Sequence, residues 1–374
     1  MTLATALCLS LALSSPGDGE EFLRSLGLPV SLADQEPKAE PAPVQAEKEK
    51  KEESPWLIAP LMSLNPKLGF SVGAIVGYMF YADEKSKFSM IGINGQYTST
   101  GSVIAGLVAK LSLGEDYHRI IALALGGKIR NDYDDFLGTG VPLKSTDELQ
   151  AIFARYTYRV WADWFLGLQA VTTNFAMIGD SAIDEQHLAV LGLTGFRSGG
   201  MGLVLFHDSR DSETSPTKGF YLNANNIGYR EWMAGNQDFD VIRVDAKAYF
   251  PVGGGHVLAL RQFNQFTIDA PPSAFAPVQL RGYKFGQYLG ENMSSIEAEE
   301  RFRLGDRFTA TVFTGVAFLY GNGQSLNDPE TIYPNIGAGL QYVLKEKEGI
   351  VANLEFAAGK RENYGVYIKL GYGF

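Results

Sequence analysis

Residues 277–304 read PVQLRGYKFGQYLGENMSSIEAEERFRL, and the two halves of this stretch differ in backbone chemistry. Three nearby prolines remove backbone donors and two glycines relax the chain, so the first half is predicted to be a loop and not a strand. The second half alternates between an apolar face of Ile296, Ala298, Phe302 and Leu304 and a charged face of Glu297, Glu299, Arg301 and Arg303, with Glu300 on the apolar side. The charged face needs an ionic partner. Arg281 can supply one, because a guanidinium forks onto a carboxylate.

The composition of the whole chain favours one large barrel over two soluble domains. Its 374 residues include 42 glycines and 12% aromatic residues, and no run of eighteen apolar residues outside the amino terminus could form a transmembrane helix. The net charge is −10, and the one dense run of lysines is mixed with glutamates. Nucleic acid is therefore excluded as a partner, since phosphate binding needs clustered Lys and Arg.

The amino-terminal segment is expected to lie outside the barrel. Residues 1–14 contain an apolar run followed by small residues, as in a secretory signal peptide, although no lysine or arginine precedes the run. Residues 15–54 are rich in Glu, Lys, Pro and Ala, and we expect them to form a disordered periplasmic tether. The only cysteine, Cys8, lies in the apolar run, so a processed chain would have no disulfide and no cysteine nucleophile.

Residues 55–374 are predicted to form a transmembrane antiparallel β-barrel. This region has 374 − 54 = 320 residues, and about twenty residues for each strand and turn gives about sixteen strands. We assign the strands to 57–64, 68–80, 86–99, 102–113, 117–130, 148–160, 163–176, 197–208, 218–231, 238–250, 256–267, 294–304, 307–319, 334–344, 349–359 and 363–374.

The lengths of the connections indicate a barrel with two different ends. An even strand number places both termini on one side, and with a periplasmic tether the even-numbered connections are periplasmic. Most of these are short, as around Gly114, Gly254 and Gly305, whereas the external set includes the long ones, 131–147, 179–187, 268–293 and 321–333. This asymmetry is typical of outer-membrane barrels. The tip Leu280–Tyr283 falls in the sixth external loop.

The last strand has the clearest alternation in the chain. Val366, Ile368, Leu370, Tyr372 and Phe374 share one face, which we assign to lipid. A strand that ends in an aromatic residue at the carboxy terminus also resembles the signal by which outer-membrane barrels are recognised for assembly. The alternative is a core strand of a soluble sheet, in which the terminal carboxylate would be buried at a cost.

A second motif lies at residues 207–221, HDSRDSETSPTKGFY. Its charged and turn-forming members are Asp208, Arg210, Asp211, Pro216, Lys218 and Gly219. We interpret it as a periplasmic turn in which the two aspartates pair with Arg210 or Lys218, and Gly219 releases the chain into the next strand. A catalytic His-Asp-Ser group is the weaker interpretation, since adjacent residues of a strand point to opposite faces.

Both motifs resemble signatures of the BamA/TamA-like bacterial surface-antigen superfamily, in a short form lacking POTRA domains. The second motif matches Asp-x-Arg-Asp followed by Pro-x-Lys-Gly-aromatic, and Leu280, Arg281, Gly282 and Tyr283 match the tip of loop six. The resemblance implies that this loop folds into the lumen and that Arg281 meets Glu299. The chain departs from the pattern at Phe313, where a second lumenal acid is expected, which would leave Arg281 only Glu299 and Glu297. The alternative is a surface loop with an incidental Arg-Gly.

The resemblance implies a bacterial outer-membrane protein that helps insert or translocate proteins or lipids through a seam between its first and last strands. Pro60 would weaken that seam, because proline provides no ladder donor. The alternative is a barrel without insertase activity, acting as a narrow pore or as a docking partner for a separate periplasmic protein or enzyme. We expect no enzymatic activity, no cofactor and no metal, because no Gly-x-Ser-x-Gly or His-Glu-x-x-His motif is present. The expected partners are outer-membrane lipid and a periplasmic protein or substrate polypeptide, and we expect the chain to be a monomer or a loosely associated dimer.

Overall fold

The computed structural model describes residues 55–87, 89–193, 195–212, 216–321, 323–326, 328–345 and 350–370. Its barrel strands are β1 (Trp56–Asn65), β2 (Gly69–Phe80), β3 (Ser89–Thr98), β4 (Val103–Leu113), β5 (His118–Tyr133), β6 (Leu143–Trp161), β7 (Trp164–Gly179), β8 (Gly195–Asp208), β9 (Gly219–Tyr229), β10 (Phe239–Gly253), β11 (His256–Ile268), β14 (Asn292–Arg303), β15 (Phe308–Tyr320), β16 (Ile332–Lys345), β17 (Ile350–Gly359) and β18 (Tyr364–Leu370). The expected signal peptide, the tether, Tyr372 and Phe374 lie outside the described ranges.

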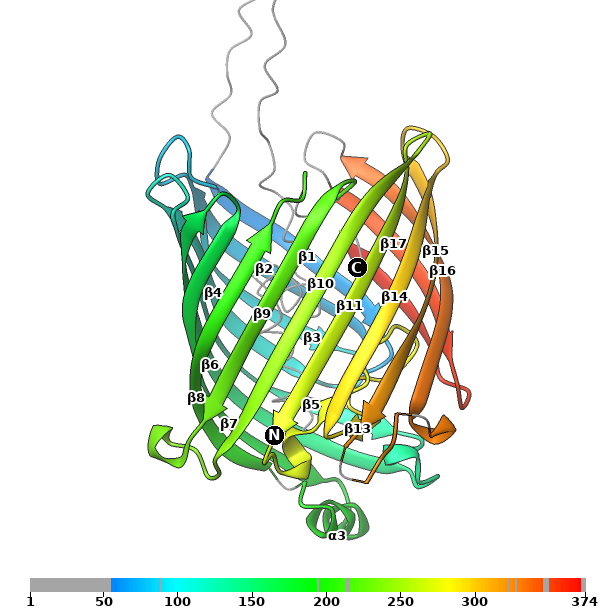
Figure 1. Ribbon diagram of the computed structural model, residues 1–374. Helices are drawn as coiled ribbons and strands as arrows, with labels where there is room; N and C mark the ends of the chain where they lie inside the picture. Colours follow the sequence, from blue (N-terminus) through cyan, green and yellow to red (C-terminus); the bar gives the residue numbers. More distant parts are fainter. Residues whose placement is uncertain are drawn as a thin grey trace, which may run out of the picture.

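The strands close into one antiparallel barrel (Figure 1). Each strand pairs with its neighbours in the sequence, and β1 meets β18 with Leu64 opposite Ile368. Sixteen strands form the ring, so the predicted all-β fold and strand number are confirmed. Within the described residues, no helix is long and apolar enough to cross a membrane.

The alternation predicted for 294–304 is present in β14. Ile296 is 56% exposed on the outer face, whereas Glu299 is 1% exposed on the inner face. Glu297 and Arg301 are buried beside Glu299, and the other strands alternate in the same way. The outer wall is therefore mostly apolar and the lumen is polar and charged, which is the arrangement of a barrel that faces lipid.

The two ends of the barrel differ in the length of their connections. The short-turn end has 114–117, 162–163, 254–255 and 304–307, and the long-loop end has 134–142, 180–194, 230–238 and 269–291. The hairpin of β5 and β6 is longer than predicted and stays paired up to Tyr133 and Leu143. Among the described residues, the long-loop end also carries four 3-10 turns, η1 (Phe136–Gly138), η2 (Glu231–Met233), η3 (Pro272–Ala274) and η4 (Pro329–Thr331).

Two short elements in the long loops differ from the prediction. Helix α3 (Ala182–Val190) forms where we expected only a loop, and the Ser181 hydroxyl caps it by accepting from the amide of Asp184 at 3.2 Å. In loop six, β12 (Ala276–Pro277) pairs with β13 (Leu289–Gly290) although prolines argued against any strand there. The next residue, Val278, donates to the carbonyl of Tyr288, so Pro277 lies at an alternate position that requires no donor.

Candidate functional site

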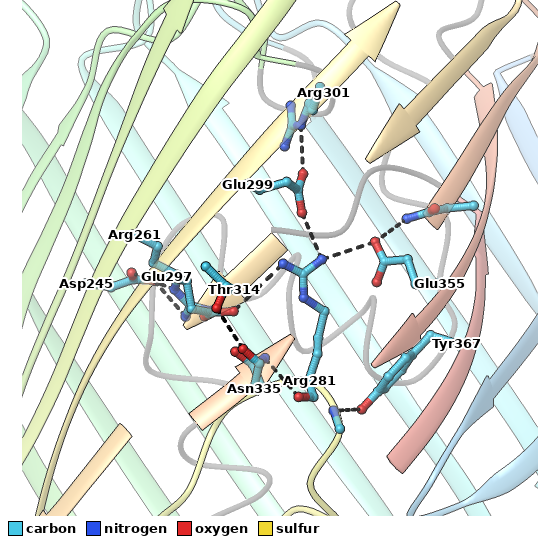
Figure 2. Close-up of polar contacts among 12 residues, drawn as sticks. Asp245, Arg261, Arg281, Glu297, Glu299, Arg301, Thr314, Asn335, Glu355 and Tyr367 are labelled. Atoms are coloured by element: carbon cyan, nitrogen blue, oxygen red, sulfur yellow. Dashed lines mark hydrogen bonds and ion pairs between the residues drawn. The ribbon is translucent and has the colours of Figure 1, made fainter. Parts of the chain in front are cut away.

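Loop six (269–291) folds into the lumen and brings Arg281 against three carboxylates (Figure 2). Arg281 Nη1 donates to Glu299 Oε2 at 2.8 Å and to Glu355 Oε1 at 3.3 Å. Its Nη2 lies 3.8 Å from Glu297 Oε2. The Arg281 side chain is 11% exposed and that of Glu299 is 0% exposed, so the charges compensate one another out of bulk water. We call Arg281 with Glu297, Glu299 and Glu355 the latch.

Glu355 corrects the expectation that Arg281 has only two acidic partners. It lies on β17, and its aliphatic stem occupies the space above Gly339, where a Cβ would be 2.8 Å from Glu355 Cγ. Alternation along β17 could have placed Glu355 inside, between the outward residues Leu354 and Phe356. That pattern does not show which inward acid faces the loop tip, because the answer depends on how loop six crosses the lumen.

Phe313 stands where the resemblance implied an acid, and it still contacts Arg281. The Arg281 Cζ lies 3.3 Å from the centroid of the Phe313 ring, which places the guanidinium over the aromatic face. Gly337 leaves room for the ring, since a Cβ there would lie 2.2 Å from Phe313 Cζ. Arg281 is therefore bound through its nitrogens to carboxylates and through its face to an aromatic ring.

The backbone at the loop tip is fixed by β16 and β18. Asn335 Nδ2 donates to the carbonyl of Arg281 at 2.9 Å, and the amide of Gly282 donates to Tyr367 Oη at 2.7 Å. Gly282 has φ +100°, and a Cβ would lie 3.2 Å from the carbonyl carbon of Ala358. Glycine is required here by both the backbone conformation and the close approach to β17.

Tyr283 is the second anchor of the tip. It is 4% exposed, and its hydroxyl donates to the carbonyl of Pro334 at 2.5 Å and accepts from the amide of Lys360 at 2.9 Å. Its ring lies on Gly359, where a Cβ would come within 2.4 Å of Tyr283 Cζ. Leu280, the first residue of the tip, is buried in the same cluster.

The far side of loop six contacts the β5–β6 connection. Lys284 Nζ donates to Asp134 Oδ2 at 2.8 Å and to the carbonyl of Asp132 at 3.0 Å. Gln287 Nε2 donates to the carbonyl of Asp135 at 3.1 Å, and the amide of Leu137 donates back to the carbonyl of Gln287 at 2.8 Å. Loop six is thus held from the carboxy-terminal strands on one side to the β5–β6 connection on the other.

The second motif is joined to the latch through Arg301. Arg301 Nε donates to Glu299 Oε1 at 2.8 Å, and Arg301 Nη1 donates to the carbonyl of Pro216 at 3.1 Å. Glu299 therefore bonds Arg281 from the long-loop side and Arg301 from the short-turn side (Figure 2). The sequence predicted the inward positions of Glu299 and Arg301 but not the contact with Pro216.

The charges within the second motif are arranged differently from the prediction for one of its two aspartates. Asp208 and Arg210 form the expected ion pair, with two parallel bonds of 2.8 and 2.9 Å. Asp211 instead accepts from Thr217 Oγ1 at 2.5 Å and from the backbone amides of Thr217 and Lys218. Burial opposes ionisation of Asp211, but these bonds hold its pKa below the ordinary value. Gly219 has φ +111° at the start of β9, which fits its expected role as the exit from the turn.

The described residues offer no arrangement suited to a resident metal ion. Within 55–370, apart from the short gaps, no group of three or more His, Cys, Asp or Glu could hold one. The acids of the latch already face guanidinium groups. What the site can do chemically is hold a loop in place by charge.

The protein is a closed sixteen-stranded barrel, and the Arg-Gly-Tyr tip of its sixth loop is anchored inside the lumen. It is similar to BamA from Haemophilus ducreyi lacking POTRA domains 1–3, with a TM-score of 0.60 and 12% identity over 86% of this chain and 71% of that one. It is also similar to CdiB from Acinetobacter baumannii, with a TM-score of 0.59 and 11% identity over 85% of this chain and 60% of that one. CdiB from Escherichia coli is similar with a TM-score of 0.56 and 13% identity over 84% of this chain and 62% of that one. No family model and no curated protein matches the sequence. The chain has the barrel fold of BamA and CdiB, as its motifs predicted.

Proposed function

We propose that this protein is a bacterial outer-membrane barrel that helps polypeptides or lipids insert into or cross the membrane at the seam between β1 and β18. The observation that carries the proposal is the direction of the Pro60 nitrogen. The amide of Met79 donates to the carbonyl of Pro55 at 2.7 Å, and the β1–β2 register continues from there without a bulge. In an antiparallel ladder, bonded and non-bonded pairs alternate, so even-numbered residues of β1 direct their nitrogens toward β18. Pro60 therefore offers no backbone donor on the edge of β1 that faces β18.

The contacts of Gly282 and Tyr283 at the tip of loop six support the same function, because they hold the last strand from inside. Gly282 bonds Tyr367 on β18, and Tyr283 bonds Pro334 on β16 and Lys360 in the β17–β18 turn. Strands β16 to β18 are thereby tied to loop six. We therefore expect β1 to be the strand that moves when the seam opens.

The outer surface supports a place in the membrane. Phe250, Phe302 and Phe308 are exposed on the outer wall near the short-turn end, and each is at least 38% exposed. Aromatic residues gather at the levels where outer-membrane barrels meet the headgroups. Between the two ends the exposed residues are chiefly branched aliphatic, such as Ile296 and Val312.

A disulfide across the seam tests the proposal. Leu64→Cys with Ile368→Cys places two cysteines on directly opposed positions of β1 and β18. Val76→Cys with Ile93→Cys is the matched control, since these residues also oppose each other, and face outward, on β2 and β3. Oxidation of the seam pair should abolish complementation of a strain that lacks the protein, and the control pair should leave complementation intact.

The alternative function is docking of a periplasmic protein without opening. Loop six is fixed at both sides of the lumen, which favours docking over a pore as the second candidate. If the oxidised seam pair still complements, the insertion and translocation role is wrong and docking is the better explanation.

A further inference from the structure

The ladder between β8 and β9 is interrupted in the middle of the wall. Pairing runs from Gly200 opposite Tyr229 to Met201 opposite Gly228, and resumes at Val204 opposite Asn225. The pairs of Gly202 with Ile227 and of Leu203 with Asn226 are missing. The register is the same on both sides of the gap, because the residue numbers of each pair add up to 429 before it and after it. Every other interruption among the described barrel pairs is accompanied by a register shift near a turn. This gap is therefore not a bulge.

Side chains replace the backbone bond that is lost in the gap. The amide of Arg230 bonds the carbonyl of Gly199, so by alternation Leu203 and Asn226 should bond each other directly. Instead the amide of Leu203 donates to Asn226 Oδ1 at 2.9 Å, and the carbonyl of Asn226 accepts from Gln169 Nε2 at 3.0 Å. Two carboxamides thus satisfy the two halves of one ladder bond, which matters because an unpaired backbone group facing lipid costs several kcal/mol.

Glycines leave room for this exchange. Gln169 lies on β7 opposite Gly202 and reaches across it to β9, where its Nε2 also donates to Asn225 Oδ1 at 3.0 Å. A Cβ at Gly202 would lie 1.6 Å from the carbonyl oxygen of Asn226. Arg155 holds the other end of Gln169 through two bonds of 3.0 and 2.6 Å to its Oε1. The gap is built by specific residues on β6, β7, β8 and β9.

The position of the gap relates it to the seam. From the seam, eight strands lead in one direction to β8 and eight lead in the other direction to β9, so the gap lies opposite the β1–β18 junction. When a closed ring opens at one point, the opposite part of its wall bends most. A ladder held there by side chains, which can turn about their own bonds, bends more easily than a continuous backbone ladder.

We infer that the β8–β9 gap is the hinge on which the barrel bends when β1 and β18 separate. The inference rests on the proposed function, because a hinge requires a seam that opens. Gln169 and Asn226 act as positioning residues, since they keep the backbone paired while the angle between β8 and β9 changes.

The experiment compares two disulfides on the same two strands. Leu203→Cys with Asn226→Cys closes the gap, and Leu205→Cys with Ala224→Cys, one bonded pair further along, ties the intact ladder as a control. Spin labels attached by chemistry that does not use cysteine, at residues 66 and 362 on the two sides of the seam, report the separation in bilayers of outer-membrane lipid. Oxidising the gap pair should reduce the width of the seam distance distribution at least two-fold, and reduction should restore it. The control pair should leave the width unchanged.

Amide exchange provides a second readout that does not depend on substrate. The Leu203 amide should exchange at least ten-fold faster than the amides of Met201 and Leu205, which lie in the regular ladder on either side. Equal effects of the two disulfides, or equal exchange at the three amides, would overturn the hinge while leaving seam opening intact. A single narrow seam distance in the unmodified protein would overturn both the opening and the hinge.

Discussion

Removal of Arg281 should destabilise the barrel chiefly by leaving carboxylates uncompensated. Arg281 bonds Glu299 at 2.8 Å and Glu355 at 3.3 Å, and both acids have side chains that are 0% exposed. Breaking a buried pair by removing one partner costs about 3–5 kcal/mol. We expect about 3 kcal/mol for Arg281→Ala, at the low end of this range, because Arg301 continues to compensate Glu299 from the other side.

The two single acid variants should differ in a direction that the geometry fixes. Glu299→Ala should cost more than Glu355→Ala, because Glu299 bonds both Arg281 and Arg301 and its contact with Arg281 is shorter. Urea unfolding in lipid bilayers, followed by tryptophan fluorescence, measures these changes. In the double variant Arg281→Ala/Glu299→Ala, the loss should be smaller than the sum of the single losses by about 1–3 kcal/mol.

A matched control uses a pair of similar geometry that does not hold loop six. Arg119, at the start of β5, donates its Nε to Asp116 Oδ1 at 2.9 Å and its Nη2 to Asp116 Oδ2 at 2.6 Å, at the short-turn end away from loop six. Their removal should destabilise the barrel but leave loop six protected from added protease. If the Arg281 and Glu299 losses simply add, the pairing does not stabilise the barrel and the reasoning is refuted.

Three further outcomes follow from other parts of the structure. Gly359→Ala places a methyl 2.4 Å from the ring of Tyr283 and should expose loop six to protease, whereas Gly95→Ala, with nothing within 4 Å of its new methyl, should not. The pKa of Asp83 is lowered from 3.8 to about 2, first by the Ser86 hydroxyl and then by the Glu115 amide. Because the pKa is lowered in the folded state, ionised Asp83 stabilises the turn above about pH 4 and this stabilisation is lost as the pH falls to about 2. Protection of the Glu115 amide from hydrogen exchange should therefore fall between about pH 4 and about pH 2, and it should not fall in Asp83→Asn. The protein should fractionate with outer membranes and migrate differently on gels when heated, and recovery as a soluble monomer without detergent would contradict the membrane assignment.

Much of the fold was predictable from the sequence because a barrel repeats one simple pattern. Alternation in 294–304 identified the inward acids of β14, and connection lengths identified the two ends. Helix α3 was missed because nine residues inside a loop give little periodic signal, although Ser181 followed three residues later by Asp184 resembles a capping pattern. Glu355 and Tyr367 were missed for another reason. Their strands were assigned, but which inward residues meet the loop tip depends on contacts 74 and 85 residues apart.

Phe313 stands where an acid was expected, and three neighbouring residues together explain how Arg281 is still held there. Phe313 on β15 stacks on Arg281, Gly337 leaves room for the ring, and Glu355 on β17 supplies the carboxylate. Phe313→Asp should therefore destabilise the barrel, because it removes the stacked ring and adds a fourth carboxylate around one guanidinium. Adding Glu355→Gln should recover part of the loss, since it returns the number of carboxylates near Arg281 to three. The same Glu355→Gln change in the unaltered chain should destabilise, so the effect of one substitution reverses its sign with residue 313. The thermal unfolding midpoints of the unaltered chain, Phe313→Asp, Glu355→Gln and the double variant, each in detergent, measure this reversal. If Glu355→Gln changes the midpoint in the same direction in both backgrounds, Glu355 does not take the place of an acid at position 313.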